Sequence, residues 1–174
     1  SMNTIASLIR HDPVAAERAV EDLSELFRAA LGSGGGESTL ADELHLTRRY
    51  LAIEALRLGE RLQVEWQLDD ALPQALPLPR LILQPLAENA ILHGIARRPE
   101  GGVLSIQVRP EGAQLAIRVR NPLPDTHAPS HGNRHAQDNI AQRLAHRYGH
   151  RARMVATAQD GYYEATLFVP LTDA

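Results

Sequence analysis

Three things that this sequence lacks narrow its class before any motif is considered. It has no cysteine, which excludes a disulfide framework and a cysteine-ligated zinc site and fits a reducing compartment such as the cytoplasm. It has no apolar run near the ~20 residues that span a bilayer, and its first residues show no signal-peptide pattern. It also lacks an excess of positive charge, because 18 basic residues are scattered among 21 acidic ones. Direct binding of nucleic acid is therefore not expected.

The first third of the chain predicts helices. After Asp12, which can cap a helix and is followed by a proline suited to a first turn, an amphipathic helix is expected up to Leu31. The stretch "GSGGGES" at residues 32–38 has little to pack and predicts a flexible joint. A second helix is expected over residues 39–58, because Thr39 with Asp42 resembles a helix start and an apolar stripe ends at Gly59. This stripe comprises Leu40, Leu44, Thr47, Leu51 and Leu58. The apolar stripe of the first helix comprises Ala16, Ala19, Val20, Leu23, Leu26, Phe27 and Ala30.

The remaining residues alternate between strand and helix patterns. Alternating apolar residues predict a strand at residues 61–68 and antiparallel hairpins at 103–120 and 152–170. Helices are expected at residues 81–94 and 136–149. This order predicts an α+β fold: a two-layer α/β sandwich with a mixed, mostly antiparallel sheet, helices on one face, and the earlier helices as an amphipathic appendage.

The helix at residues 81–94, "LILQPLAENAILHG", is apolar yet carries four polar side chains. Asn89 and His93 are four residues apart and share one face, and Gln84 with Glu88 forms a second pair beside it. The amide oxygen of Asn89 suits magnesium, which prefers oxygen ligands and usually bridges to phosphates. Glu88 can orient or deprotonate a water or hydroxyl if it faces the same site. An ordinary solvent-facing polar surface is the alternative interpretation.

The sequence of this helix resembles a motif of a known family. "LQPLAENAILHG" is similar to the asparagine box "LQPLxENAxxHG" of the LytS-type sensor histidine kinases, whose kinase domains have the Bergerat ATP-binding fold of the GHKL type. "YLAIEALRLGERL" upstream and "DNIAQRLAHRYG" downstream are similar to the same family, so the resemblance covers most of the chain.

The resemblance implies a function and partners. It implies the cytoplasmic catalytic domain of an inner-membrane two-component sensor kinase that uses ATP and Mg²⁺. Such a domain passes the γ-phosphoryl group of ATP to a histidine and thence to a response regulator, here expected to be of the LytTR type. Sensor kinases of this family pair through helices, so a homodimer is expected in the full protein. Packing of the apolar stripe on the helix at residues 39–58 of the same chain is the alternative.

The resemblance also implies residue roles. Asn89 would coordinate magnesium, and Glu88, the candidate for catalysis, would lie near the phosphates together with His93. Asn139 and Arg143 would sit on the helix that flanks the nucleotide. The start of that helix, expected near residue 136, can offer free backbone amides to the phosphates, whereas a surface charge is the alternative interpretation of Arg143.

The chain departs from the family pattern at two glycine-rich boxes. Asn121 falls where many of these kinases carry the aspartate that accepts a hydrogen bond from the adenine amino group, and a neutral acceptor makes a weaker bond. Pro122 and Pro124 stiffen what should be a pliant glycine turn. In "GNRHA" only Gly132 remains, with Arg134 where another glycine is expected. Asn121 and Gly132 are still the candidates for ATP binding at these boxes.

The beginning of the chain raises the question of the phosphoacceptor. "SMNTIASLIR" resembles the tail of the family motif "HFLFNSxN", so the acceptor histidine is expected upstream of these residues. The 174 residues by themselves are therefore expected to be inactive in phosphoryl transfer. We expect residues 1–37 to be part of a dimerisation and phosphoacceptor region with its joint, and residues 38–174 to be the catalytic domain.

Two other functions fit the same residues. The altered glycine boxes favour a degenerate kinase domain that binds ATP weakly or not at all and controls its response regulator by contact. A GHKL-type ATPase or protein-serine kinase unrelated to two-component signalling is the third candidate, and "YLAIEALRLGERL" argues against it.

Overall fold

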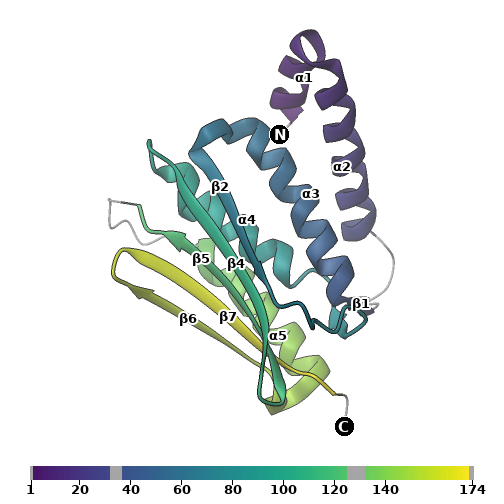
Figure 1. The fold of residues 1–174 in the computed structure, drawn as a ribbon, viewed down its shortest axis with the longest axis vertical. Coiled ribbons are helices and arrows are strands. Elements are labelled where there is room, and N and C mark those ends of the chain that lie inside the picture. Colours follow the sequence, from purple (N-terminus) through teal and green to yellow (C-terminus); the bar gives the residue numbers. More distant parts are fainter. Residues whose placement is uncertain (1, 32–36, 125–131, 173–174) are drawn as a thin grey trace.

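A computed structural model of the chain describes residues 2–31, 37–124 and 132–172 (Figure 1). Short 3₁₀ turns follow α3, α4 and α5. In chain order the elements are α1 (Met2–His11), α2 (Pro13–Leu31), β1 (Glu37–Thr39), α3 (Leu40–Leu58), β2 (Leu62–Leu68), β3 (Pro77–Pro79), α4 (Leu83–His93), β4 (Gly102–Glu111), β5 (Gln114–Pro122), α5 (Gly132–Tyr148), β6 (Arg153–Gln159) and β7 (Tyr162–Pro170).

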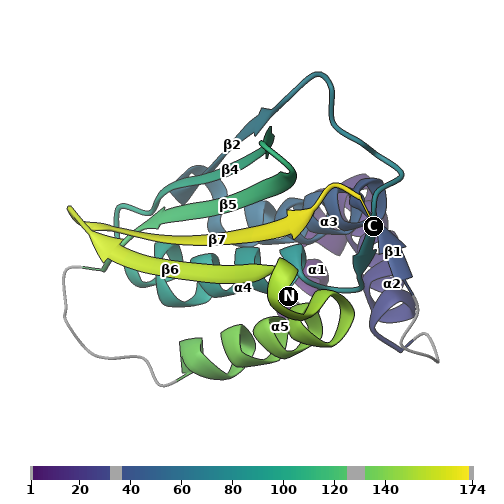
Figure 2. The same cartoon turned by 90° about the horizontal axis from the view of Figure 1, so that it is seen from below.

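A five-stranded sheet forms one layer of the fold. Its strand order is β2-β4-β5-β7-β6, with β2 parallel to β4 and every other neighbouring pair antiparallel. Helices α3, α4 and α5 lie together on one face of this sheet (Figure 2). The predicted two-layer α/β sandwich with a mixed, mostly antiparallel sheet is therefore confirmed, and both predicted hairpins are present.

The core lies between the sheet and these helices. In β4 the residues Leu104, Ile106 and Val108 are fully buried while their neighbours are partly exposed, as expected for a strand with one face on a core. Ile91 of α4 and Ile140 of α5 belong to the same buried cluster. Burial of this continuous apolar layer, at about 25 cal/mol per Å², is the main force that holds α4 and α5 on the sheet.

Helix α3 begins as the sequence predicts. The hydroxyl oxygen of Thr39 accepts a hydrogen bond from the amide of Asp42 at 3.2 Å, and the Asp42 carboxylate accepts one from the amide of Thr39 at 3.0 Å. This capping box satisfies two amides that a helix start leaves unpaired. The predicted apolar stripe of α3 is buried, and it consists of Leu40, Leu44, Thr47, Leu51 and Leu58.

The strand β1 corrects the predicted joint. Glu37 and Ser38 were expected to belong to the flexible stretch at residues 32–38, but they pair with Pro79 and Leu78 of β3 in a small antiparallel ribbon. Sequence reasoning missed this ribbon because each of its strands is three residues long. The remaining residues of the predicted joint, 32–36, lie outside the described residues.

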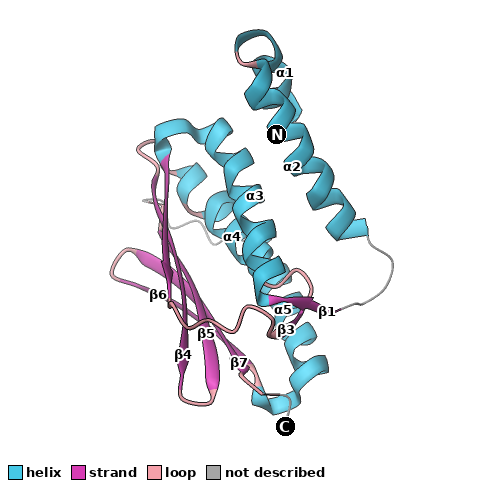
Figure 3. Cartoon of the chain, turned by 45° about the vertical axis from the view of Figure 1, so that its right-hand side comes forward, coloured by secondary structure: helices cyan, strands magenta, loops and turns pink. Residues whose placement is uncertain are grey.

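Helices α1 and α2 form the appendage and extend away from the sheet (Figure 3). The Asp12 carboxylate accepts a hydrogen bond from the amide of Ala15 at 2.9 Å, which confirms the predicted cap of α2. The predicted stripe of α2 is only partly covered, because Ala16 and Ala19 are buried whereas Val20 and Phe27 are 49% and 55% exposed.

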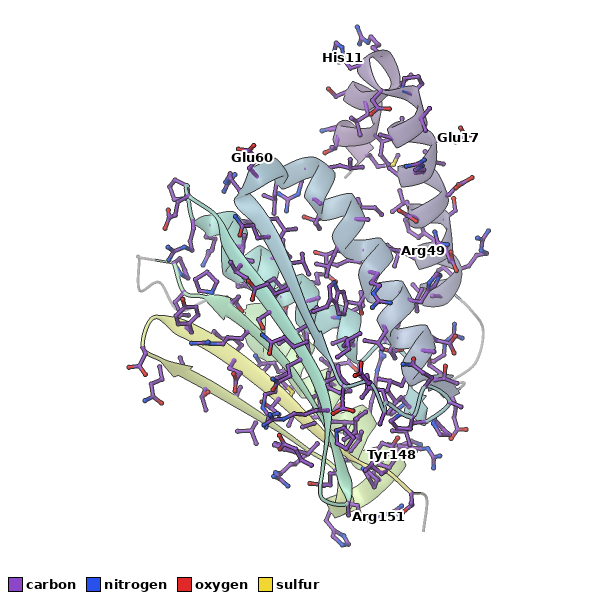
Figure 4. The ribbon with its side chains drawn as sticks, in the orientation of Figure 1. His11, Glu17, Arg49, Glu60, Tyr148 and Arg151 are labelled. Carbon is purple, nitrogen blue, oxygen red and sulfur yellow. The ribbon has the colours of Figure 1, made fainter. Side chains whose placement is uncertain are left out.

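Ion pairs join α2 to α3. Arg49 of α3 pairs with Asp22 and, at 2.7 Å, with Glu25 of α2, and His45 lies 3.4 Å from Glu25. Figure 4 labels Arg49 where these two helices approach each other. Helices α2 and α3 are thus neighbours, but the buried stripe residues Ala16 and Ala19 cluster with Ile5 of α1, whereas Leu26 and Phe27 line a cavity beside α3.

Helix α5 begins earlier than predicted. The start expected at residue 136 is wrong, because the helix runs from Gly132 to Tyr148. A glycine at the first helical position disfavours the helix only slightly, whereas Ile140, Leu144 and Tyr148 bury one face of it completely. Packing of this buried face therefore determines the extent of the helix more than the residue types of its first turn do.

Candidate functional site

Helix α4 is the centre of the candidate site because it touches the other elements that carry predicted site residues. It contacts α3 on one side and α5 on the other, and it also contacts β5 of the sheet. Asn89 and His93 lie on α4, Asn121 on β5, and Asn139 with Arg143 on α5. The fold thus brings three predicted groups of residues, far apart in sequence, onto neighbouring elements.

The four polar residues of α4 divide into two groups. Gln84 and Glu88 line a cavity of about 450 Å³ between α2, α3 and α4, together with Phe27 and Tyr50. Asn89 and His93 are not among its lining residues, although Asn89 directly follows Glu88. A step of one residue turns a helix by about 100°, so adjacent residues project in different directions. The helix therefore presents polar groups both toward the α2 appendage and away from it.

Glu88 faces the appendage with an acidic neighbour. Burial raises the pKa of its carboxyl group, and the negative charge of Glu54 raises it further. Glu54 itself is buried and accepts a hydrogen bond from Arg57 Nε at 2.8 Å. Burial raises the pKa of the Tyr50 hydroxyl, and the negative charges of Glu54 and Glu88 raise it further. A carboxyl group with a raised pKa is a better proton acceptor when ionised than an ordinary glutamate.

Asn89 and His93 are half-buried on α4. The Asn89 Nδ2 atom is buried and has no hydrogen-bond partner, which is unusual for a buried amide and marks a place where a polar ligand would restore a bond. Burial lowers the pKa of His93, and the charge of nearby Arg97 lowers it further. The lowered pKa favours the neutral imidazole, which has one N–H to donate and one nitrogen to accept.

Asn121 is almost completely enclosed at the end of β5. It is 3% exposed, and its Nδ2 atom donates a hydrogen bond to the carbonyl oxygen of Pro122 at 2.9 Å. Its Oδ1 atom is buried without a partner. Gly94, at the end of α4, lies against this amide, since a Cβ on Gly94 would be 2.1 Å from Nδ2. An acceptor oxygen thus stands unsatisfied next to the helix that carries Asn89, as an adenine amino group would require.

Asn139 and Arg143 lie one helical turn apart on α5 and are joined. Arg143 Nε donates a hydrogen bond to Asn139 Oδ1 at 3.1 Å. The Nη1 atom of Arg143 donates to the carbonyl oxygen of Arg80 at 2.7 Å and reaches that of Leu81 at 3.3 Å. This guanidinium therefore holds the loop before α4, a contact that the sequence does not reveal.

Gly132 is the first residue of α5. Any free backbone amides at that helix start would belong to residues near 132 rather than 136. Residues 125–131, which precede it, lie outside the described residues.

Glu43 is a residue of this region that sequence reasoning missed. It lies on α3, is 1% exposed, and accepts hydrogen bonds from the backbone amides at the start of α4. A signal was present: Glu43 falls three residues after Leu40 and four before Thr47, on the buried stripe of α3. A carboxylate at a core position of an amphipathic helix requires a partner.

The described residues limit how a metal ion could be bound. They contain no cluster of three or more histidine, cysteine, aspartate or glutamate side chains that could hold a metal ion. Asn89 would then be one protein ligand of a magnesium ion whose other ligands are waters and phosphates, which is how magnesium usually binds. Among the same residues, no helix combines the length and the hydropathy needed to cross a membrane.

Comparison with known proteins identifies the class. A family model described as "Histidine kinase" matches residues 1–62. Sensor histidine kinase BtsS of Escherichia coli (strain K12) is 34% identical over 177 residues, covering 99% of this chain and 31% of that protein. Sensor protein LytS of Staphylococcus haemolyticus (strain JCSC1435) is 33% identical over 107 residues, covering 61% of this chain and 18% of that protein. The chain thus spans about a third or less of these relatives.

Solved structures show the same fold. The histidine kinase domain of the blue-light activated histidine kinase from Erythrobacter litoralis EL346 has a TM-score of 0.53 at 19% identity, covering 95% of this chain and 80% of that one. The catalytic domain of histidine kinase ThkA has a TM-score of 0.55 at 13% identity, covering 78% of this chain and 96% of that one. The sequence matches confirm the predicted resemblance to the LytS-type sensor histidine kinases.

Proposed function

We propose that this chain is the ATP-binding catalytic part of a two-component protein-histidine kinase. In the whole protein, the γ-phosphoryl group of ATP would pass to a histidine upstream of these residues and then to a response regulator, expected to be of the LytTR type. The observation that carries the proposal is the buried, unpaired Oδ1 atom of Asn121 beside α4. Leaving such an acceptor unpaired costs roughly 1–3 kcal/mol, which a ligand with a donor group recovers.

Each predicted site residue has a proposed role. Asn121 accepts a hydrogen bond from the adenine amino group, and Asn89 holds Mg²⁺, which when bound neutralises phosphate charge. His93, whose lowered pKa favours the neutral imidazole, donates a hydrogen bond to the phosphates. Glu88 faces the α2 appendage, the side from which an acceptor histidine on a helical region would approach, and serves as proton acceptor.

The roles on α5 are of a different kind. Gly132 allows the chain to approach the phosphates closely at the start of α5, where backbone amides and the helix dipole favour anions. Asn139 is exposed and can reach a phosphate directly. Arg143 adds positive charge at this face while it holds the loop before α4.

The surroundings of the whole protein are proposed on the same basis. We place this part in the cytoplasm, attached to an inner-membrane sensor region, and expect the full protein to be a homodimer. The motifs "VRNPLPD" and "GNRHAQDNI" resemble AlgZ (also called FimS), the sensor kinase of alginate and fimbrial regulation, and this finer likeness stays a prediction.

A second candidate function is the degenerate kinase domain. It is favoured by Pro122, which packs closely on the neighbouring strand β4. A Cβ on Gly102 of that strand would lie 2.5 Å from the Cγ atom of Pro122. A loop held in this way cannot open as a glycine turn can. Such a domain would act on its response regulator by contact alone.

Calorimetric titration of the chain with ATP, with and without Mg²⁺, tests the proposal. We expect saturable binding that Mg²⁺ strengthens and that GTP, which lacks the adenine amino group, does not reproduce. Absence of binding at millimolar ATP and Mg²⁺ would reject the kinase and favour the degenerate domain. Transfer is tested in the full-length protein, where labelled ATP should give an acid-labile phosphohistidine upstream of these residues.

A further inference from the structure

The loop that enters α4 has an unusual backbone. Leu81 has a φ of 56°, in the left-handed region that side-chain-bearing residues rarely adopt. Helix α4 follows directly, and its N-cap residue, Ile82, has no side-chain hydrogen bond to the first turn. A helix start without a local cap, preceded by a strained residue, requires contacts from elsewhere in the fold.

Glu43 of α3 supplies the missing cap. Its Oε1 atom accepts a hydrogen bond from the amide of Leu81 at 2.8 Å, and its Oε2 atom accepts from the amides of Ile82 at 2.9 Å and Leu83 at 3.0 Å. The side chain of Ser38 is a further hydrogen-bond partner. Three successive amides of one helix start thus converge on a single buried carboxylate from another helix.

The carbonyl groups of the same loop are held from the opposite side. Arg143 of α5 donates to the carbonyl oxygens of Arg80 and Leu81. The backbone at Leu81 is therefore fixed through its N–H by α3 and through its C=O by α5. Glu43 and Arg143 belong to the two helices that contact α4 from either side.

The consequence concerns Asn89. It lies six residues after Leu83 on the same short helix, so a tilt or shift of the helix start moves its amide. A ligand group that must meet a metal ion tolerates little displacement, and an error of about 1 Å can reduce function on the order of a hundredfold. The start of α4 is thus where the position of Asn89 is set.

We propose that Glu43 is a positioning residue of the nucleotide site: its buried carboxylate fixes the start of α4 and thereby holds Asn89 where it meets magnesium. This inference rests on the proposed function, because it assumes that Asn89 is the magnesium ligand. It assigns to α3 a part in the site although α3 contributes no group that touches the nucleotide.

The test compares two buried glutamates of α3. Glu43→Gln replaces the carboxylate with a neutral amide of nearly the same shape, and Glu43→Asp keeps the charge but shortens its reach. Glu54→Gln is the matched control, because Glu54 is also buried on α3 but its hydrogen-bond partner is Arg57, within the same helix. For each variant, the affinity for ATP is measured by calorimetry with Mg²⁺ and with a chelator, and the melting temperature is recorded.

In both Glu43 variants, the factor by which Mg²⁺ strengthens ATP binding is expected to fall roughly tenfold or more. Metal-free ATP binding should change little. Glu54→Gln is expected to keep both affinities even if its melting temperature falls. Equal losses with and without Mg²⁺ would indicate a merely structural role and overturn the inference, as would unchanged affinities. If Glu43→Gln does not fold, Glu43→Asp decides alone. Failure of the proposed function is seen separately, as absence of ATP binding by the unmodified chain.

Discussion

The side chain of Asn121 packs directly on the backbone of Gly94, where β5 meets the end of α4. A Cβ on Gly94 would lie 2.1 Å from Asn121 Nδ2 and 2.6 Å from the carbonyl oxygen of Ala90. Because real Cβ atoms do not approach other atoms so closely, glycine is the residue that fits here. The glycine that follows His93 in the motif is thus required by the lack of space for a side chain. Its backbone does not require glycine, since the φ of Gly94 is −113°.

Gly94→Ala is therefore expected to displace the amide of Asn121. We expect a loss of about 1–3 kcal/mol in the free energy of unfolding, as for other overpacking substitutions, together with weaker ATP binding. Urea unfolding and calorimetry measure the two effects. Gly112→Ala is the control, because Gly112 has a φ of 61° and no atom within 4 Å of an added Cβ. It should cost about 1 kcal/mol through strain and leave ATP binding intact, and equal ATP binding by both variants would contradict the clash.

Asn89→Ala is expected to weaken ATP binding in the presence of Mg²⁺ while the fold is kept. Its side chain is half-buried and makes no hydrogen bond through Nδ2, so removal leaves no group newly unpaired. Loss of one ligand should cost a few kcal/mol at most, since waters and phosphate oxygens remain. Titration with Mg²⁺ at fixed ATP measures the effect. The same magnesium dependence in both proteins would exclude Asn89 as a ligand.

Asn121→Asp tests the adenine contact and is expected to tighten ATP binding. A charged acceptor makes a hydrogen bond about twice as strong as a neutral one. The free protein should at the same time lose about 1–3 kcal/mol of stability, because the bond from Nδ2 to the Pro122 carbonyl disappears and two oxygens then face each other. Calorimetry with ATP and unfolding in urea measure the two changes. Unchanged or weaker ATP binding would show that Asn121 does not meet adenine.

Glu88 is expected to give the protein a pH-dependent stability. Its pKa is raised in the folded state, so the folded protein holds this proton more tightly than the unfolded chain. The stabilising contribution is complete below the unfolded pKa, near 4.5, and is lost as pH rises through the folded pKa. Glu88→Gln does not titrate, so its melting temperature relative to the unmodified protein should increase as pH rises from 4 to 7. A constant difference across this range would show that Glu88 has an ordinary pKa.

Arg49→Ala is expected to loosen α2 from α3. Partly exposed ion pairs contribute at most about 1 kcal/mol, so global stability should change little. Amide hydrogen exchange over residues 13–31 should nevertheless become faster, because Arg49 pairs with two acidic residues of α2. Arg109→Ala is the control, since Arg109 pairs with Glu111 within the sheet hairpin. Unchanged exchange in α2 would show that apolar contacts alone hold this helix.

Local patterns predicted the elements of this fold well. The alternation in β4, the capping box at Thr39 and the stripe from Leu40 to Leu58 each depend on residues within a few positions of one another, and all are present in the structure. The ribbon of β1 and β3 and the start of α5 at Gly132 depend instead on contacts between distant segments. Such contacts leave little signal in a single sequence.

The sequence named the candidate residues of the site, but it did not indicate where their side chains point. The resemblance named Asn89, Asn121 and Arg143, yet only the structure reveals that Arg143 holds the loop before α4. Likewise, Glu88 and Asn89 are adjacent in sequence but project from different sides of the helix. Glu43, 40 residues before Leu83, was visible only as a charge on a buried stripe.

The parallel pairing of β2 with β4 has a consequence for the order in which the chain folds. Each antiparallel hairpin joins residues close in sequence, whereas Leu62 meets Gly102 only after the whole of α4 has been accommodated between them. Closing that longer loop costs more entropy, so the two hairpins can assemble first and the β2-α4-β4 crossover last. Pulse-labelled hydrogen exchange during refolding should then protect β4, β5, β6 and β7 before α4, and simultaneous protection would contradict this order. The segment that carries Asn89 would be the last to reach its native environment, so a chain that stalls late in folding would have its two hairpins formed but no place for a nucleotide.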